Sequence, residues 1–287
     1  MNTEHYGPYR VSRRIASGAL GSVYMARHTS SDRPYAVKVF EPTELGRGMT
    51  LETAQRLFVA EIREAQAMNH PHIAQIHEIG IEKGVPFAAM ECVQNGRSLH
   101  RYCSARDQRL PLDDVIRIIG RCADALQYAH ERGVVHRDIK PRHVLLDVGL
   151  EPKLIDFGLA VLGPQEGTLE SEHGTPSRYL SPEQIAGAAP AGKQADMFSL
   201  GVVLYELLAG THPFKATSLA EHRALVVGTR HTPVRKYRSD VPRELQAITN
   251  RCLLKRPDKR YATAMHLSAN LDVANDVLVA TDSGGTK

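Results

Sequence analysis

The sequence predicts an α+β protein of two lobes, with a small strand-rich lobe followed by a larger, mostly helical lobe. Short alternating or apolar runs, separated by Gly, Pro and Ser-Asp, fill the opening third of the chain. Helical periodicity dominates the remainder. Between the two parts, Gln94-Asn95-Gly96 is typical of a turn, so we expect a hinge near residues 91–96.

Composition narrows the function classes. The 287 residues, 42% of them apolar and 24% charged, suffice to bury a full core. A net charge of +4 with scattered Lys and Arg does not predict a nucleic-acid-binding surface. The N-terminus lacks an apolar stretch, and the most apolar run, Met197–Ala209, is too short for a bilayer. The four cysteines show no CxxC pairing or metal-ligand spacing, so we expect a cytoplasmic protein with reduced thiols.

The first lobe is expected to comprise residues 1–93, with strands around one helix. Apolar residues recur at helical spacing from Thr53 to Met68, and Asn69-His70-Pro71 ends that pattern. The expected strands are Tyr9–Ile15, Ser22–Arg27, Pro34–Phe40, Ile73–Ile81 and Pro86–Val93.

The second lobe is expected to comprise residues 94–274, followed by a flexible tail at 275–287. Short strands are predicted at Val144–Asp147 and Lys153–Ile155. The stretch Gly158–Pro190, rich in Gly, Pro, Ser and Thr, is predicted to be a loop, and a loop of this length is usually functional. The expected helices are Asp113–Arg132, Ala195–Ala209, Leu219–Val227, Arg243–Leu254 and Ala262–Ala274.

Two motifs in the first lobe could bind phosphate. In the segment Ser17–Val23, Gly18 and Gly21 would let backbone amides approach a phosphate group, although a hairpin alone can also need glycine. Lys38 follows Ala36 and Val37 in a predicted apolar strand. It is either an edge residue whose charge reaches solvent or a cation held in a cleft by a helix carboxylate.

Two motifs in the second lobe carry acidic groups. Polar residues in Val134–Leu146 stand between apolar ones, which costs free energy unless they are paired or used. Asp138 and Lys140 can point into one space, where one would accept a hydroxyl proton and the other would steady a phosphoryl group. Asp156, just before Phe157-Gly158, offers the oxygen ligands that Mg²⁺ favours. Each motif alone has an ordinary structural explanation.

In their order and spacing, these motifs resemble the protein kinase family over about residues 9 to 270. Three later segments also resemble the family. His173–Glu183 is similar to the end of its activation segment, Asp196–Gly201 to the start of its central helix, and Arg256–Arg260 to its late arginine motif. Asp138-x-Lys140 with Thr175 resembles serine/threonine kinases, and HRDIKP and YLSPEQ resemble bacterial ones. The resemblance implies the bilobal kinase fold.

The resemblance also implies roles for single residues. Lys38, paired with Glu61 or failing that Glu64, would hold the ATP phosphates. Asp138 would be the catalytic base beside Lys140, and Asp156 the main Mg²⁺ ligand. The remaining ATP-binding set would be Ile15, Gly18, Gly21, Val23, Ala36, Leu145, the gatekeeper Met90, and the backbones of Glu91 and Val93. Glu183 and Arg260 would form a buried ion pair below the substrate platform.

Arg137 beside Asp138 indicates a basic pocket for a phosphate on the activation segment. Thr168 and Ser171 are the candidate acceptors in that segment. We hypothesise that phosphorylation of one of them orders the segment through new Arg contacts. The alternative is that both are ordinary loop residues.

Two residues depart from the family pattern. Ala16 replaces the first loop glycine, with a modest expected effect on nucleotide affinity. His143 replaces the metal-binding asparagine. A neutral imidazole offers one nitrogen, which Mn²⁺ accepts more readily than Mg²⁺, and a protonated imidazole would repel the ion. The outcomes left open are a slower one-metal kinase, a Mn²⁺-preferring kinase and a nucleotide-binding pseudokinase; a His143 that only braces the loop fits all three.

The expected function is therefore ATP-dependent transfer of phosphate to Ser or Thr hydroxyls of proteins, including this protein itself, with Mg²⁺ or Mn²⁺. The principal alternative is a pseudokinase that binds nucleotide and scaffolds partners. A small-molecule kinase of similar fold is disfavoured, because the segment Gly174–Glu183 resembles the surface on which protein kinases hold peptides. No nucleic-acid partner and no membrane span in this chain are expected.

Overall fold

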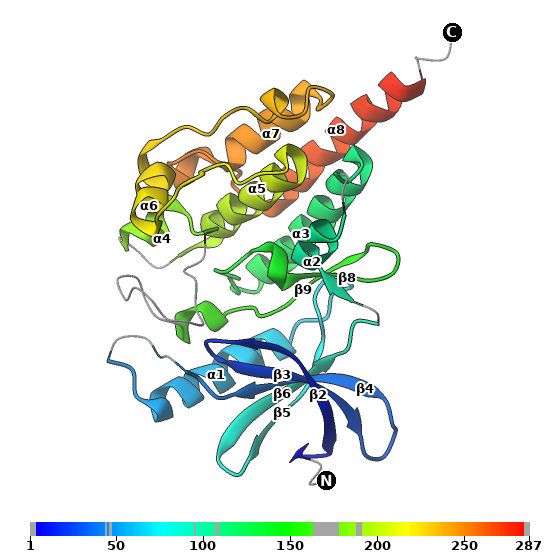
Figure 1. The fold of residues 1–287 in the computed structure, drawn as a ribbon, viewed down its shortest axis with the longest axis vertical. Coiled ribbons are helices and arrows are strands. Elements are labelled where there is room, and N and C mark those ends of the chain that lie inside the picture. The colour runs from blue at the N-terminus through cyan, green and yellow to red at the C-terminus, as the bar shows by residue number, and fades with distance from the viewer. Residues whose placement is uncertain are drawn as a thin grey trace.

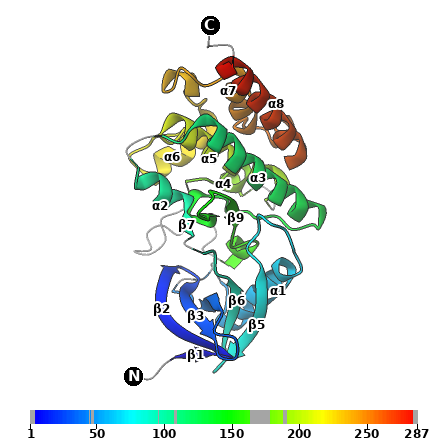
Figure 2. The ribbon, with the colours of Figure 1, turned by 90° about the vertical axis from the view of Figure 1, so that its right-hand side faces the viewer.

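The computed structural model describes residues 4–43, 45, 48–94, 96–106, 109–162, 178–187 and 191–283. The chain forms two lobes, a strand-rich lobe at the N-terminal end and a helical lobe at the C-terminal end (Figures 1 and 2). The predicted two-lobed α+β fold is confirmed. Within the described residues, no helix is both long and apolar enough to cross a membrane.

The N-terminal lobe is built on a six-stranded antiparallel sheet in the order β1-β2-β3-β4-β6-β5. Lys38 lies within the sheet, between Val23 on one neighbouring strand and Ala88 on the other. The strands are β1 (His5–Tyr6), β2 (Tyr9–Gly18), β3 (Gly21–His28), β4 (Pro34–Phe40), β5 (Ile76–Glu82) and β6 (Val85–Glu91).

Helix α1 (Leu51–Gln66) packs against β5 and β6 of this sheet. Thr50 caps its start, because the Thr50 side chain accepts a hydrogen bond of 3.2 Å from the Thr53 amide. Its buried face carries Phe58 and Ile62, and the Phe58 ring stacks on Phe40 of β4 at 4.6 Å between centroids. Helix and sheet thus share one apolar core, which fixes the helix relative to Lys38.

The C-terminal lobe is organised around α5, which is buried along most of its length and packs against α3 and α7. A helix that is apolar on all sides belongs in the interior of a domain. A small sheet, β7-β8-β9, lies where this lobe meets the other. The elements are β7 (Arg97–Ser98), α2 (Leu99–Ser104), α3 (Leu112–Glu131), β8 (Val144–Leu146), β9 (Pro152–Leu154), α4 (Pro182–Ala186), α5 (Lys193–Ala209), α6 (Leu219–Gly228), α7 (Arg243–Cys252) and α8 (Ala264–Ser283).

The sequence predictions were wrong for two short helices and for the end of the last helix. Helix α4 lies inside the stretch predicted as loop. It was not predicted because its start is specified by a reciprocal cap between Ser181 and Gln184, which a search for periodicity does not detect. Helix α2 was also missed, since its six residues show no repeating pattern. Helix α8 continues to Ser283, into the segment we expected to be a flexible tail.

Candidate active site

The side chains predicted to carry the chemistry meet between the lobes. Lys38 Nζ lies 2.6 Å from Asp156 Oδ1, and Lys140 Nζ lies 2.6 Å from Asp138 Oδ2. His143 stands between the two pairs, with Nδ1 at 3.4 Å from Asp138 Oδ2 and Nε2 at 3.7 Å from Asp156 Oδ2. The structure thus brings five predicted site residues into one continuous chain of charged and polar groups.

A buried carboxylate in α5 holds the loop that carries Asp138. The amides of His136 and Arg137 donate to Asp196 Oδ2 and Oδ1 at 2.9 and 2.8 Å, and His130 Nε2 lies 2.8 Å from Oδ2. Asp196 is fully buried, where a carboxylate persists only if it is hydrogen-bonded. The sequence marked Asp196 as the start of a helix but did not reveal this anchoring role.

His136 links the loop to the strand that delivers Asp156. The Asp138 amide donates to His136 Nδ1 at 3.4 Å, so the ring proton lies on Nε2 and is donated to the Ile155 carbonyl at 2.9 Å. Arg137 and Asp156 both have left-handed backbones, with φ of 68° and 65°. Such conformations are costly for residues other than glycine and cluster at functional sites.

The two acidic side chains are held in their ionised forms. Burial alone would raise the pKa of Asp156, but the Lys38 ammonium outweighs it and holds that pKa well below its usual range. Burial would likewise raise the pKa of Asp138, and the neighbouring His143 and Lys140 outweigh it and lower that pKa. Both carboxylates are therefore charged at neutral pH.

Asp138 keeps one oxygen free. Its Oδ2 accepts from Lys140, whereas its buried Oδ1 has no hydrogen-bond partner among the residues that the structure describes. A buried carboxylate oxygen without a partner is costly and calls for a functional explanation. An incoming hydroxyl group would supply the missing donor.

His143 braces the loop from within. Its Nδ1 lies 2.9 Å from the Asp138 backbone oxygen, which can only accept, so Nδ1 carries the proton and Nε2 keeps its lone pair. Burial lowers the pKa of His143 to about 4, so the ring is neutral at pH 7. The bracing interaction raised as an alternative from the sequence is therefore present, and Nε2 stays available as a nitrogen ligand beside Asp156.

The predicted pair between Lys38 and Glu61 is not formed in this structure. Lys38 binds Asp156 instead, and Glu61 Oε2 lies 3.9 Å from Arg137 Nη1. Glu61 also lies against Gly158, where a Cβ atom would collide with its carboxylate. The fallback partner, Glu64, is exposed. The prediction failed because Asp156 competes for the buried ammonium and Glu61 has its own cation nearby.

The predicted adenine-binding residues lie on strands of both lobes. Ala36 on β4 pairs with Met90 on β6, Val23 lies on β3, and Leu145 lies on β8. Ile15 lies on β2, at the register shift between Arg14 and Ala16. No ligand tests their role, which stays a prediction.

The hinge is braced by the side chain of Glu91. Its carboxylate pairs with Lys153 of β9 at 3.0 Å, and its amide donates to the Gln75 carbonyl at 2.8 Å. Val93 accepts a hydrogen bond from the Gly96 amide at 2.9 Å. The hinge is thus tied to both lobes, while the predicted contacts of the Glu91 and Val93 backbones with adenine stay predictions.

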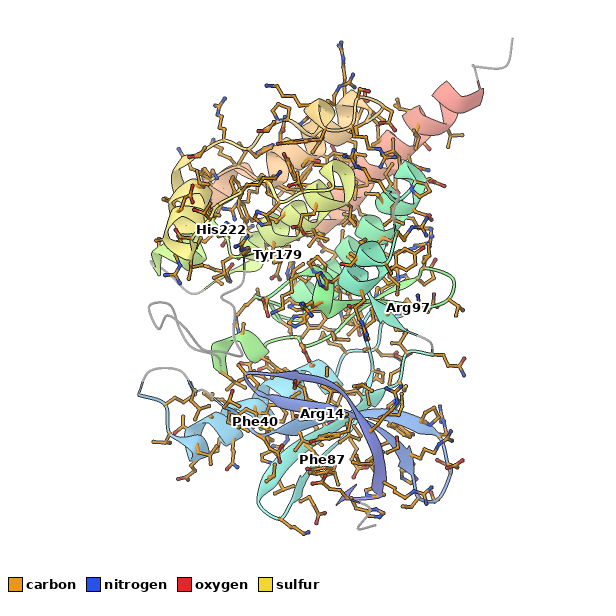
Figure 3. The ribbon with its side chains drawn as sticks, viewed as in Figure 1. Arg14, Phe40, Phe87, Arg97, Tyr179 and His222 are labelled. Carbon is orange, nitrogen blue, oxygen red and sulfur yellow. The ribbon has the colours of Figure 1, made fainter. Side chains whose placement is uncertain are left out.

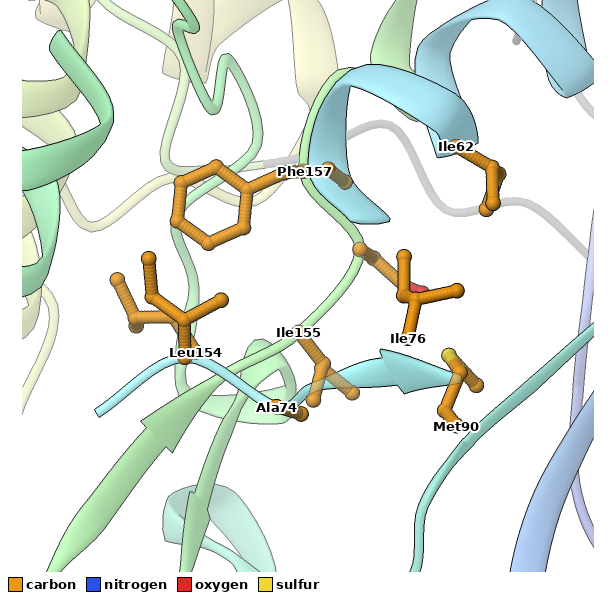
Figure 4. A pocket seen from close by; sticks show the side chains of 10 residues that line it. Ile62, Ala74, Ile76, Met90, Leu154, Ile155 and Phe157 are labelled. Carbon is orange, nitrogen blue, oxygen red and sulfur yellow. The ribbon is translucent and has the colours of Figure 1, made fainter. Parts of the chain in front are cut away.

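Behind Met90 lies a small apolar cavity of about 20 Å³ (Figure 4). Phe157 lies across it from Met90 and packs on the His136 ring at 4.5 Å between centroids. The cavity is too small for a ligand beyond about one water molecule. It shows only that the segment carrying Asp156 is packed against α1 and the sheet.

The predicted ion pair between Glu183 and Arg260 is confirmed. Arg260 donates to Glu183 Oε1 and Oε2 at 2.6 and 2.7 Å, and its side chain is almost fully buried. Three backbone carbonyls, of Leu254, Gln194 and Lys255, accept its remaining donors. Such saturation is what a buried guanidinium requires.

The predicted phosphorylation sites cannot be placed. Thr168 and Ser171 lie outside the described residues, as does Thr175, which only supports the resemblance to serine/threonine kinases. The described chain continues at Arg178, and Gln184 Nε2 donates to the Arg137 carbonyl at 2.9 Å. The end of the activation segment is therefore tied directly to the catalytic loop.

The donor set suits a divalent cation with help from a nucleotide. Across the described residues, no three His, Cys, Asp or Glu side chains are grouped so as to hold a metal ion by themselves. Asp156 offers two carboxylate oxygens and His143 one nitrogen. A Mg²⁺ or Mn²⁺ ion would take its other ligands from phosphate and water, which is the usual arrangement at nucleotide sites.

Comparisons with known proteins agree with this geometry. The family model described as protein kinase domain matches residues 9–271. CBL-interacting protein kinase 4 of Oryza sativa subsp. japonica is 34% identical over 263 residues, which are 89% of this chain and 55% of that protein. Serine/threonine-protein kinase PrkC of Bacillus subtilis is 31% identical over 281 residues, 94% of this chain and 41% of that protein. This chain thus spans about half the length of these relatives.

Solved structures extend the comparison to the whole fold. The kinase domain of Mycobacterium tuberculosis PknI superposes with a TM-score of 0.74 at 26% sequence identity, covering 96% of this chain and 99% of that one. Sequence match, fold and site geometry lead to the same conclusion. The chain belongs to the protein kinase family, with homologues of the serine/threonine type.

Proposed function

We propose that this chain is an active protein kinase that transfers the γ-phosphate of ATP to Ser or Thr hydroxyls of proteins, its own included. Asp138 Oδ1, which has no hydrogen-bond partner in the described part of the chain, is the observation that supports this most directly. A binding-only domain gains nothing from a buried carboxylate oxygen without a donor, whereas a catalytic base needs one that is free to accept a proton.

Three residues of this chain have separate roles in the proposed transfer. Asp138 accepts the proton as the substrate oxygen forms its bond to phosphorus and the bond between phosphorus and the ADP oxygen breaks. Lys140, 2.6 Å from Asp138, supplies positive charge to the transferring group. Lys38 binds the α- and β-phosphates after leaving Asp156, which frees the Asp156 carboxylate for a cation.

Asp156 and His143 would hold that cation. When bound, the cation neutralises charge on the phosphates and keeps them in line for transfer. Because one protein ligand is a nitrogen, we propose that Mn²⁺ supports a higher rate than Mg²⁺. Cytoplasmic location is part of the same proposal, since the four cysteines are free thiols, as expected in a reducing compartment.

A pseudokinase is the second candidate, and one observation favours it. Lys38 and Glu61 are not paired with each other, and an active arrangement needs that ion pair in place. We propose instead that this arrangement is regulated. A phosphate at Thr168 or Ser171 would attract Arg137 and release Glu61 towards Lys38. Intact-mass analysis after incubation with ATP tests this, and phosphate absent from the segment 163–177 contradicts it.

Radiolabel transfer from ATP to the chain itself and to a generic basic protein tests the activity. Reactions contain Mg²⁺ or Mn²⁺, and Asp138→Asn serves as the matched control. Phosphoamino-acid analysis then separates Ser and Thr from Tyr. Label that does not depend on Asp138 contradicts the catalytic proposal. Nucleotide-dependent thermal stabilisation without any label supports the pseudokinase.

A further inference from the structure

Two histidines converge on one backbone carbonyl at the end of the activation segment. His212 Nε2 lies 3.0 Å from the Arg178 oxygen, and His222 Nε2 lies 3.1 Å from the same atom. The two rings are 5.0 Å apart, His212 in the connection after α5 and His222 in α6. A carbonyl oxygen has two lone pairs and can accept from both imidazoles.

The proton positions follow from the neighbours. The Phe214 amide and the Phe214 carbonyl both lie 3.1 Å from His212 Nδ1. The Arg178 oxygen can only accept, so in the tautomer that bonds to it the proton of a neutral His212 lies on Nε2 and Nδ1 accepts from the Phe214 amide. Burial lowers the pKa of His212 to about 4 and also lowers the pKa of His222. His222 Nδ1 faces the Phe214 carbonyl at 3.1 Å, so a neutral His222 donates either to that oxygen or to Arg178.

Arg178 and Tyr179 lie in the described stretch just before α4, and Tyr179 is held there by two hydrogen bonds. The Tyr179 carbonyl accepts from Ser199 at 2.7 Å, and the Tyr179 hydroxyl donates to Glu206 at 2.6 Å. The Tyr179 ring meets the His212 ring edge-on, at 5.8 Å between centroids, and Figure 3 labels Tyr179 and His222 in the helical lobe. Since Gln184 further along donates to the Arg137 carbonyl, the stretch connects the two histidines with the catalytic loop.

Beside this stretch lies a hollow of about 500 Å³ that adjoins the catalytic loop. Tyr179, Glu206 and Arg106 lie along it, and Pro141 joins it to the loop of Asp138. Its lining combines polar and charged side chains with apolar ones such as Leu110 and Val203, a mixture that can contact a polypeptide chain. The position of Tyr179 sets the shape of its wall.

We propose that His212 and His222 are positioning residues for the protein substrate. They hold the Arg178 carbonyl and thereby fix the Tyr179 wall of the hollow beside the catalytic loop. This inference rests on the proposed kinase function and adds two residues that position the wall along which the substrate polypeptide would lie. Neither histidine contacts the groups that would bind ATP, so their loss affects the protein substrate and leaves ATP binding intact.

Steady-state kinetics of His222→Leu, His222→Gln and His212→Leu test the proposal. Val226→Ala is the control, because Val226 is buried in the same helix but its side chain is not hydrogen-bonded to Arg178. Loss of one of the two hydrogen bonds to the Arg178 carbonyl predicts a rise of about tenfold in KM for the basic protein substrate. KM for ATP stays unchanged. His222→Gln keeps one donor and shows a smaller rise.

Hydrogen–deuterium exchange gives a readout that does not require activity. The amides of Ser181 and Gln184 are protected by the cap of α4. We expect them to exchange about tenfold faster in His222→Leu and His212→Leu than in wild type or Val226→Ala. If His222→Leu does not fold, the exchange rates and KM values of His222→Gln and His212→Leu test the proposal in its place.

The outcomes separate this proposal from the kinase activity itself. Exchange equal to that of Val226→Ala, or an unchanged KM for the protein substrate in a chain that is active, overturns it. A wild-type chain without any transfer contradicts the proposed function instead. In that case, affinity for the basic protein, measured by fluorescence anisotropy, replaces KM, and equal affinity in the variants overturns the positioning role.

Discussion

His143 Nδ1 donates a hydrogen bond of 2.9 Å to the backbone carbonyl of Asp138. The residue that departs most from the family pattern therefore braces the loop that carries the proposed base. The same geometry turns Nε2 towards Asp156, at 3.7 Å from its Oδ2 atom. One substitution thus preserves the bracing of the loop and changes the chemistry of the metal ligand.

Replacing His143 by Asn should raise the activity supported by Mg²⁺. An amide side chain can still donate to the Asp138 carbonyl while its oxygen offers the ligand type that Mg²⁺ prefers. We expect about a tenfold increase in kcat/KM with Mg²⁺ and a lower ratio of Mn²⁺ to Mg²⁺ activity. Initial-rate assays with each metal measure it. An unchanged or lower Mg²⁺ rate would show that the loop has adapted to the imidazole.

Two glycines of the predicted phosphate-binding loop should respond differently to replacement by alanine. Gly21 has a φ of 127°, and a Cβ atom there would collide with the Val39 carbonyl, so Gly21→Ala strains the hairpin. A Cβ atom at Gly18 meets nothing within 4 Å. We expect Gly21→Ala to lower the free energy of unfolding by about 1–3 kcal/mol and Gly18→Ala to leave it nearly unchanged. Equal denaturant midpoints for the two variants would contradict this.

Removing the charge of Glu183 should destabilise the second lobe strongly. Glu183→Gln leaves the buried Arg260 guanidinium uncompensated, which costs about 3 kcal/mol. The control is Asp258→Asn, which breaks an exposed pair with Arg256 and should barely move the melting temperature. Thermal unfolding followed by circular dichroism compares the two. Similar shifts in both would contradict the buried-pair account.

The same pair predicts how stability depends on pH. Burial would raise the pKa of Glu183, but the hydrogen bonds and charge of Arg260 outweigh it and lower that pKa. A lowered folded-state pKa contributes stability above the unfolded-state value and loses it as pH falls through the folded-state value. Glu183→Gln should therefore show a shallower acid limb in its unfolding midpoint. An acid limb identical to that of wild type would assign the dependence to other groups.

The sequence was sufficient to predict the lobes and the gathering of Lys38, Asp138 and Asp156, because ordered motifs specify which loops must meet. It could not choose the partner of Lys38, since Asp156 and Glu61 are both carboxylates within reach of one ammonium and local packing decides between them. The two histidines on Arg178 were also invisible, because their contact depends on how α6 packs. Short capped helices such as α4 leave no periodic signal.

The most direct test of the proposed function is the dependence of phosphate transfer on Asp138. Radiolabel transfer from ATP to a basic protein is compared for wild type and Asp138→Asn, with Mg²⁺ and with Mn²⁺. Loss of a general base predicts a fall of about 10² to 10⁴ in kcat for the variant, with nucleotide-dependent thermal stabilisation retained. Equal label in both proteins, or none in wild type with either metal, would contradict it.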